Sequence, residues 1–265
     1  MSTDARTNLY QNFHDRQLVE QEPASRRAAE KILAMLREYF APQSLLDVGC
    51  GLGSWLKVAQ DLGLSDLRGL EGPWIQDSPL VVDPTLIQQM DLESPFTLGR
   101  RYDLAVCLEV AEHLSPAAAT GFVDSLVAHA DHILFSAAVP FQGGHHHLNE
   151  QLLSYWIAHF ARHDYIPLDL FRARLWIDQS IPWWLRQNLI LFVRRTALES
   201  NPALLAESKI NRPLAIIHPD LYLARLQSAH QVQQSYAKLM TLFQQGGNFS
   251  VHRTPDGNLN ISRLP

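Results

Sequence analysis

Cysteine is scarce in this chain, which has only Cys50 and Cys107 among its 265 residues. Two cysteines provide neither a disulfide framework nor the ligand spacing of a structural zinc site, so we expect a protein of a reducing compartment. No apolar run reaches the roughly 18 residues that span a bilayer. The polar N-terminal segment also lacks the apolar core of a signal peptide. Together these absences predict a cytoplasmic protein without a membrane partner.

A long basic block is also absent. The chain carries 22 Lys and Arg against 27 Asp and Glu, for a formal net charge of -5. This balance argues against nucleic acid as a partner. Hydrophobic residues make up 46% of the chain, which is enough for one large buried core.

Three regions follow one another along the sequence. Residues 1–42 are predicted to be a polar arm up to residue 24 and then a helix that Ser25 caps. Strand and helix patterns alternate over 43–195, which predicts a Rossmann-like, doubly wound α/β sheet. Its last two strands, near 166–171 and 188–194, would form an antiparallel hairpin at one edge of the sheet.

The third region, 196–265, is a C-terminal extension. A long helix is predicted over 219–245, ended by Gly246 and Gly247, and a hairpin is predicted around Pro255-Asp256-Gly257. Apolar residues recur along the helix at a spacing of about 3.6, so one of its faces should be buried against another surface. This helix is our candidate for the contact in a homodimer.

The organising motif of the sequence is Leu46-Asp47-Val48-Gly49-Cys50-Gly51-Leu52-Gly53. It reads as a buried strand, then a glycine-rich turn, then the start of a helix, and such a corner can bind a nucleotide. A NAD or FAD site is the alternative for this corner. Its glycine spacing is Gly-x-Gly-x-x-Gly, whereas the third glycine here comes one position earlier.

Two further acids fall at the ends of the next two predicted strands. Glu71 can accept hydrogen bonds from the two hydroxyls of a ribose, and Asp91, which precedes Leu92, can accept one from an adenine amino group. In a parallel sheet these strand ends lie along one edge. The ordered set is therefore more specific than the glycine loop alone.

In these motifs the chain resembles the class I S-adenosylmethionine-dependent methyltransferases. The resemblance covers roughly residues 30–195 and includes Leu108-Glu109-Val110-Ala111-Glu112-His113-Leu114. It implies a seven-stranded sheet with an antiparallel last strand. It also implies that Glu71 holds the ribose and Asp91 the adenine. Asp47, Gly49, Cys50, Gly51 and Gly53 would hold the methionine end, and Leu108 and Glu109 would border the sulfonium.

A metal is the alternative for the motif Glu109-x-x-Glu112-His113. On one helical turn these three side chains would share a face and could ligate a divalent cation. A similar motif in the quinone O-methyltransferase branch is associated with a metal. The simpler interpretation is that His113 packs beside the cofactor pocket, so we expect no bound metal.

A run of three histidines follows the fifth predicted strand, after Gly143-Gly144. A neutral imidazole can take the proton of a hydroxyl as that hydroxyl attacks a methyl group, which makes His145, His146 and His147 candidate catalytic residues. The alternative is that this loop merely begins the following helix.

Aromatic residues precede the last predicted strand. Trp176, Trp183 and Trp184, with Arg186, could provide flat walls for a sugar ring or an aromatic acceptor. Core packing or a subunit contact is the alternative.

The sequence thus predicts an S-adenosylmethionine-dependent methyltransferase that acts on a small molecule or a glycan, at a hydroxyl oxygen activated by a loop histidine. The alternatives are N-methylation of a small molecule and a regulatory protein that binds the cofactor without catalysis. Neither the acceptor nor the acting histidine can be read from the sequence.

Overall fold

The computed structural model describes residues 3–245, 249–253 and 259–263. The chain forms two compact units, residues 1–216 and residues 217–265. The first unit contains all the motifs predicted up to residue 195. The sequence predicted the α/β domain to end at residue 195, whereas the first unit continues to residue 216.

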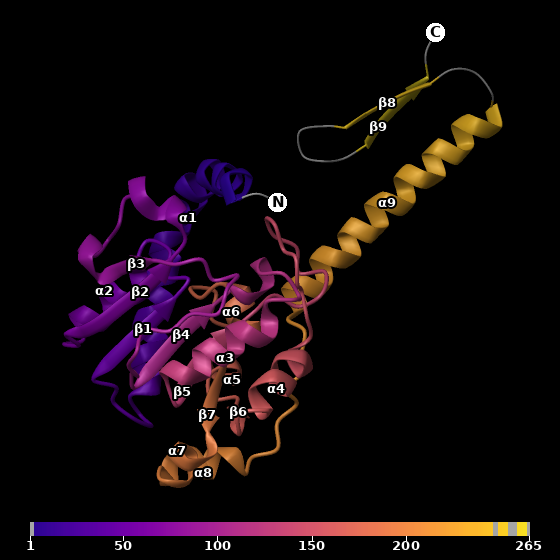
Figure 1. Ribbon diagram of the computed structural model, residues 1–265. Helices are drawn as coiled ribbons and strands as arrows, with labels where there is room; N and C mark the ends of the chain where they lie inside the picture. Colours follow the sequence, from indigo (N-terminus) through magenta and orange to yellow (C-terminus); the bar gives the residue numbers. More distant parts are fainter. Residues whose placement is uncertain (1–2, 246–248, 254–258, 264–265) are drawn as a thin grey trace. The chain divides into compact units, whose positions relative to one another are not determined.

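A seven-stranded sheet with the strand order β3-β2-β1-β4-β5-β7-β6 forms the centre of the first unit (Figure 1). Strands β1 to β5 pair in parallel, and β7 runs antiparallel to both β5 and β6. This topology confirms the predicted fold class, including the antiparallel edge hairpin. The strands are β1 (Ser44–Val48), β2 (Asp66–Glu71), β3 (Ile87–Gln89), β4 (Leu104–Leu108), β5 (His132–Ser136), β6 (Tyr165–Leu168) and β7 (Ile190–Arg194).

Helices cover both faces of this sheet. Successive strand residues point to opposite faces, and the core accordingly separates into two clusters: Leu45 and Leu134 belong to one, Leu46 and Phe135 to the other. The first cluster includes residues of α1 (Thr3–Leu36), α2 (Ser54–Asp61), α5 (Arg172–Leu175), α6 (Trp183–Asn188), α7 (Arg195–Glu199) and α8 (Pro202–Ser208). The second includes residues of α3 (Ala119–His129) and α4 (Leu153–Ala161).

Helix α1 corrects the prediction of an N-terminal arm. The chain is helical from Thr3 to Leu36, with Pro23 inside the helix, so Ser25 is not its N-cap. A proline inside a helix removes one backbone hydrogen bond and normally suggests a boundary. Here the apolar residues beyond Pro23, among them Ala28 and Ile32, are fully buried in the first core cluster, and this packing stabilises the helix.

Short 3-10 helices fill the connections after several strands. They are η1 (Pro73–Asp77), η2 (Pro84–Leu86) and η3 (Ala111–His113). Residues 116–118 form a turn, and helix α3 begins after it at Ala119. Of the 3-10 helices, η1 follows β2 and η3 follows β4, so both lie at the carboxyl ends of parallel strands, where open sheets of this kind bind their ligands.

The second unit consists of the predicted long helix, α9 (Pro219–Gln245), and the predicted hairpin of β8 (Phe249–Arg253) and β9 (Leu259–Arg263). The residues proposed to end the helix and to form the hairpin turn lie outside the described part. Along α9 the side chains of Tyr222, Leu226 and Tyr236 are about half exposed or more. Self-association through this helix stays a prediction. Among the described residues, no helix is long and apolar enough to cross a membrane.

Candidate active site

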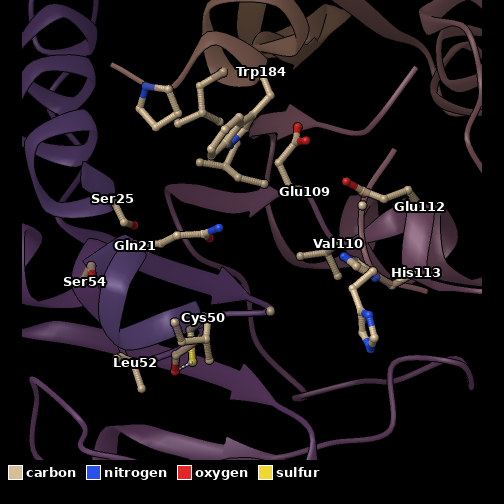
Figure 2. Close-up of a pocket in the computed structure, with 18 of the residues that line it drawn as sticks. Gln21, Ser25, Cys50, Leu52, Ser54, Glu109, Val110, Glu112, His113 and Trp184 are labelled. Carbon is tan, nitrogen blue, oxygen red and sulfur yellow. Dashed lines mark hydrogen bonds between the residues drawn. The ribbon is translucent and has the colours of Figure 1, made fainter. Parts of the chain in front are cut away.

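A pocket of about 530 Å³ opens at the carboxyl ends of β1, β2 and β4. Figure 2 shows Cys50, Leu52 and Ser54 at one end of the pocket and Glu112 and His113 at the other. We call the part lined by helix α1 and by the pocket residues between Asp47 and Leu92 the cofactor half. The part lined by residues 108–110, 112–114, 142–145, 147 and 182–185 is the acceptor half.

The glycine loop forms the floor of the cofactor half. Gly49 has a φ of 76°, and a Cβ at this position would lie 2.3 Å from Cγ2 of Val110. Its amide donates to the carbonyl of Leu70 (2.8 Å), which ties the loop to the end of β2. Gly51 and Cys50 line the pocket, whereas Gly53 is the N-cap of α2 and does not line it.

Two buried carboxylates face this half. Asp47 is 3% exposed, and no hydrogen bond to its Oδ2 atom is found among the described residues. Burial, and then the nearby Glu71, raise the pKa of Asp47 well above its usual value. Glu71 accepts hydrogen bonds from the amides of Gly51 and Gly72, both at 2.8 Å. Burial still raises the pKa of Glu71, because it outweighs those hydrogen bonds. A cationic ligand would compensate both carboxylates.

The third predicted acid lies beside them. Asp91 follows β3 and lines the pocket with Leu92. Asp91 is exposed and Leu92 is buried, and Oδ1 of Asp91 accepts the amide of Glu93 at 3.1 Å. The two residues thus provide an accessible carboxylate next to an apolar surface.

Two walls of the cofactor half were missed by the sequence analysis. Residues 18–25 of α1 line it, including Gln21 and Ser25, and Glu22 accepts a hydrogen bond from Oγ of Ser54 (3.4 Å). Trp74 lines it as well, with its ring so close to Gly72 that a Cβ there would lie 2.1 Å from Cη2. The Gly72-Pro73-Trp74 sequence after a strand-ending acid was the available signal for Trp74.

Glu109 belongs to the acceptor half. It has a positive φ of 54°, an uncommon conformation for a residue other than glycine. Two buried amides hold its carboxylate: Nε2 of Gln142 donates to Oε2 (2.8 Å), and Nδ2 of Asn188 donates to Oε1 (3.2 Å). Because Glu109 precedes η3, it does not share a helical face with Glu112 and His113, contrary to the expectation from the sequence.

Glu112 and His113 are instead grouped with His147. The potential ligand atoms of these three residues all lie within 4.8 Å of one another. Burial, and then the neighbouring Glu109, raise the pKa of Glu112 well above its usual value. The rings of His113 and His147 meet edge to face, with their centroids 4.9 Å apart.

The three loop histidines occupy different environments. His145 and His147 line the pocket, and His146 does not. Nδ1 of His147 lies 2.8 Å from Oε1 of Glu150. Burial, followed by the other two histidines, lowers the pKa of His145, which favours its neutral form.

Of the residues predicted to form an aromatic wall, some line the pocket and others do not. Trp183 and Trp184 line the pocket, with ring centroids 5.7 Å apart. Trp176 and Arg186 do not line it. Arg186 is buried, and its Nη1 donates to the carbonyl of Trp176 (2.8 Å), so this pair holds the segment between α5 and α6 together.

The sequence also matches a known protein family. A sequence model of the methyltransferase domain matches residues 18–178, which is more than half of the chain. The chain belongs to this methyltransferase family. The match confirms the resemblance stated above, and it begins within α1, at the residues that line the cofactor half.

This methyltransferase is also similar to several solved structures. The sugar N-methyltransferase KedS8 from Streptoalloteichus sp ATCC 53650 is 19% identical, covers 66% of this chain and 88% of its own, and has a TM-score of 0.49. The plantazolicin methyltransferase BpumL in complex with SAH is 17% identical (73% and 91% covered, TM-score 0.48). Magnesium protoporphyrin IX methyltransferase (ChlM) from Synechocystis PCC 6803 is 15% identical (64% and 80%, TM-score 0.44). No curated protein matches the chain.

Proposed function

We propose that this methyltransferase transfers a methyl group from S-adenosylmethionine to a hydroxyl oxygen of a small molecule or glycan. The observation that carries the proposal is the set of carboxylates around the pocket, in particular the buried Asp47, whose Oδ2 atom accepts no hydrogen bond from the described residues. S-adenosylmethionine has a cationic ammonium and a cationic sulfonium. Buried carboxylates favour such a ligand over a neutral or anionic one.

The residues of the cofactor half fit this ligand. Asp47 would accept hydrogen bonds from the ammonium, and Glu71 would accept those of the ribose hydroxyls while it keeps the amide of Gly51. Asp91 and Leu92 would meet the adenine, and Trp74 offers a flat face beside them. When bound, the cofactor supplies a methyl group for in-line displacement from sulfur to the acceptor oxygen.

The residues of the acceptor half would place that oxygen and remove its proton. Trp183 and Trp184 offer flat surfaces for the acceptor. Because His145 and His147 line the pocket and His146 does not, one of the first two would take the hydroxyl proton as the new carbon–oxygen bond forms. Positioning of the oxygen opposite the sulfur supplies much of the rate enhancement in such a transfer.

The test is formation of S-adenosylhomocysteine by the purified chain with S-adenosylmethionine and a panel of hydroxylated small molecules and glycans. We expect product with at least one acceptor, methylated at oxygen by mass spectrometry. Methylation at nitrogen would support the N-methyltransferase alternative. Tight cofactor binding in calorimetry without turnover on any acceptor would instead indicate a regulatory protein.

A further inference from the structure

The pocket carries an excess of negative charge. Seven Asp and Glu residues line it, whereas neither lysine nor arginine occurs among its described lining residues. Five of the seven belong to the cofactor half, where a cationic cofactor accounts for them. Glu109 and Glu112 belong to the acceptor half, so their charge bears on the acceptor.

Glu112 is the carboxylate whose charge is least compensated. It lines the pocket and is 0% exposed, and neither of its carboxylate oxygens has a hydrogen bond of standard geometry with a described residue. The backbone around it is held firmly, because the amides of Leu148 and Asn149 donate to its carbonyl at 2.7 and 2.9 Å. Buried charges in proteins are normally paired. The side chain therefore presents a fixed carboxylate to a cationic ligand.

Glu109 adds a second carboxylate beside it. After burial, the charge of Glu109 is the main cause that raises the pKa of Glu112. The amides of Gln142 and Asn188 orient the Glu109 carboxylate, but they are neutral groups and leave its charge in place. In Figure 2 Glu109 lies between Trp184 and Glu112, and the carboxylate of Glu112 points toward Glu109. The two side chains thus form one negatively charged surface.

The nearby histidines do not provide this surface with a permanent positive charge. Ring nitrogens of His113 and His147 lie within 4.8 Å of a carboxylate oxygen of Glu112. An imidazole, however, carries its proton only part of the time near neutral pH. Nδ1 of His147 also lies 2.8 Å from Oε1 of Glu150, which is a third carboxylate. A positive charge on the ligand would balance what the histidines leave.

Aromatic rings from α6 complete the surroundings. Trp183 and Trp184 line the acceptor half, with their ring planes 85° apart. The face of an indole ring attracts an ammonium group, and Trp is the most effective side chain for this contact. Two carboxylates together with two indoles favour a protonated amine over a neutral hydroxyl, and they disfavour an anion.

We propose that the acceptor carries a protonated amine, which binds between the carboxylates of Glu109 and Glu112 and the rings of Trp183 and Trp184. This inference rests on the proposed function, because it names the chemical class of the acceptor in that reaction. A protonated nitrogen has no lone pair. The amine therefore anchors the acceptor, and a separate hydroxyl of the same molecule receives the methyl group. Hydroxylated amines, such as amino sugars and phenolic alkylamines, have this chemistry.

The charge preference is tested by binding to the protein saturated with S-adenosylhomocysteine, so that no turnover is needed. Tyramine, tyrosol and phloretate share one phenol ring and carry an ammonium, a hydroxyl and a carboxylate. Glucosamine, glucose and glucuronate form the corresponding sugar set. Saturation-transfer NMR at millimolar concentrations gives the affinities. In at least one set we expect the amine to bind at least about tenfold more tightly than the neutral probe, as charge-assisted hydrogen bonds do. The carboxylate probes should not bind.

Glu112→Gln keeps the shape of the side chain and removes its charge. We expect the affinity for the amine to fall about tenfold, and the affinity for the neutral probe to stay unchanged. Glu30→Gln is the matched control, because it makes the same chemical change at an exposed position of α1 that does not line the pocket. This variant should bind all probes as the wild type does. Calorimetry with S-adenosylhomocysteine shows that each variant is folded.

The proposal is overturned if, in both sets, the amine binds no more tightly than the neutral probe or does not bind at all. Equal losses of both affinities in Glu112→Gln overturn it as well, since the side chain would then act through its shape. Neither result affects the proposed function, which is judged by methyl transfer to oxygen. A preference for amines without such transfer to any acceptor would instead overturn the proposed function alone.

Discussion

The two halves of the pocket are built in different ways. In the cofactor half, the glycine loop and the amides of Gly51 and Gly72 place main-chain atoms around buried carboxylates at the ends of β1 and β2. In the acceptor half, side chains from η3, the histidine loop and α6 line the cavity. Main-chain geometry can bind a ligand that a whole family shares. An acceptor that is specific to one enzyme must instead be bound by side chains that vary.

Removing the imidazole of His145 should give the largest loss of activity. Only the function of the acceptor half should be affected. General-base catalysis contributes roughly 10²- to 10⁴-fold to a rate. We expect His145→Ala to lower kcat by about that factor and to leave the Kd of S-adenosylhomocysteine unchanged. The comparison is His146→Ala, whose turnover should equal that of the wild type. Equal turnover in all three proteins would assign proton removal to another group.

A methyl group at Gly49 should damage the cofactor half instead. The new Cβ would lie 2.3 Å from Val110 and would impose a φ of 76° on an L-residue, so the loop must move. We expect Gly49→Ala to weaken S-adenosylhomocysteine binding on the order of 10- to 100-fold, measured by calorimetry. The left-handed conformation alone costs about 1–2 kcal/mol.

Gly63→Ala is the matched control for Gly49→Ala. Gly63 has a similar φ of 94°, but nothing lies within 4 Å of the added Cβ. We expect a small loss of stability in a thermal melt and unchanged affinity for the product. Weakened binding in this variant too would show that general loss of stability, and not the contact with Val110, accounts for the effect at Gly49.

The tryptophans allow a sharper comparison between the halves. Trp74 lines the cofactor half and Trp184 the acceptor half. An aromatic contact adds about 0.5–1.5 kcal/mol beyond area burial, so we expect Trp74→Ala to weaken product binding by about tenfold. Trp184→Ala should instead raise the KM for the acceptor and leave product binding unchanged. The reverse pattern would exchange the two assignments.

The smallest effect is expected at the surface just after α1, outside the residues that line the pocket. The carboxylate of Glu38 accepts two hydrogen bonds from Arg174 (2.9 and 2.8 Å) on the surface. The hydrogen bond to Arg174 is the main cause that lowers the pKa of Glu38. A lowered folded-state pKa stabilises the fold above the unfolded pKa, and this contribution disappears as the pH falls through the folded-state value.

Glu38→Gln should therefore change the melting temperature by only about 1 °C at pH 7, because exposed ion pairs contribute little. The difference from the wild type should begin to shrink as the pH falls below about 4.3, the ordinary pKa of Glu, and should disappear below the lowered folded-state pKa. A difference that persists in acid would mean that Glu38 acts through packing and not through its charge.

The same contrast explains what the sequence could predict. The strands, the antiparallel β7 and the strand-end acids Asp47, Glu71 and Asp91 follow from local patterns and topology rules, because strand ends meet at one edge whatever the side chains do. The wall formed by residues 18–25 could not be predicted in this way. The polar character of residues 1–24 suggested an arm, and the packing that keeps α1 continuous involves residues distant in the sequence.

For the acceptor half, the sequence predicted a set of residues but did not predict how they are arranged in space. The motif around Glu109 suggested one helical face, yet the positive φ of Glu109 turns it toward Gln142 and Asn188, and His147 takes its place beside Glu112 and His113. The segment after Trp176 likewise divides between the pocket and the core, since Trp183 faces the cavity and Arg186 does not. These outcomes depend on pairings between loops, which carry no periodic signal.

The main-chain hydrogen bonds between the histidine loop and the turn after β4 have a consequence for engineering. The amides of Leu148 and Asn149 both donate to the carbonyl of Glu112. The histidine loop and the turn after β4 therefore form one structural unit, although they are far apart in the sequence. A chimera that takes only residues 141–150 from a relative would contain that relative's histidines without the turn that holds them in position. Transfer of acceptor preference between such enzymes should therefore require moving 109–113 and 141–150 together.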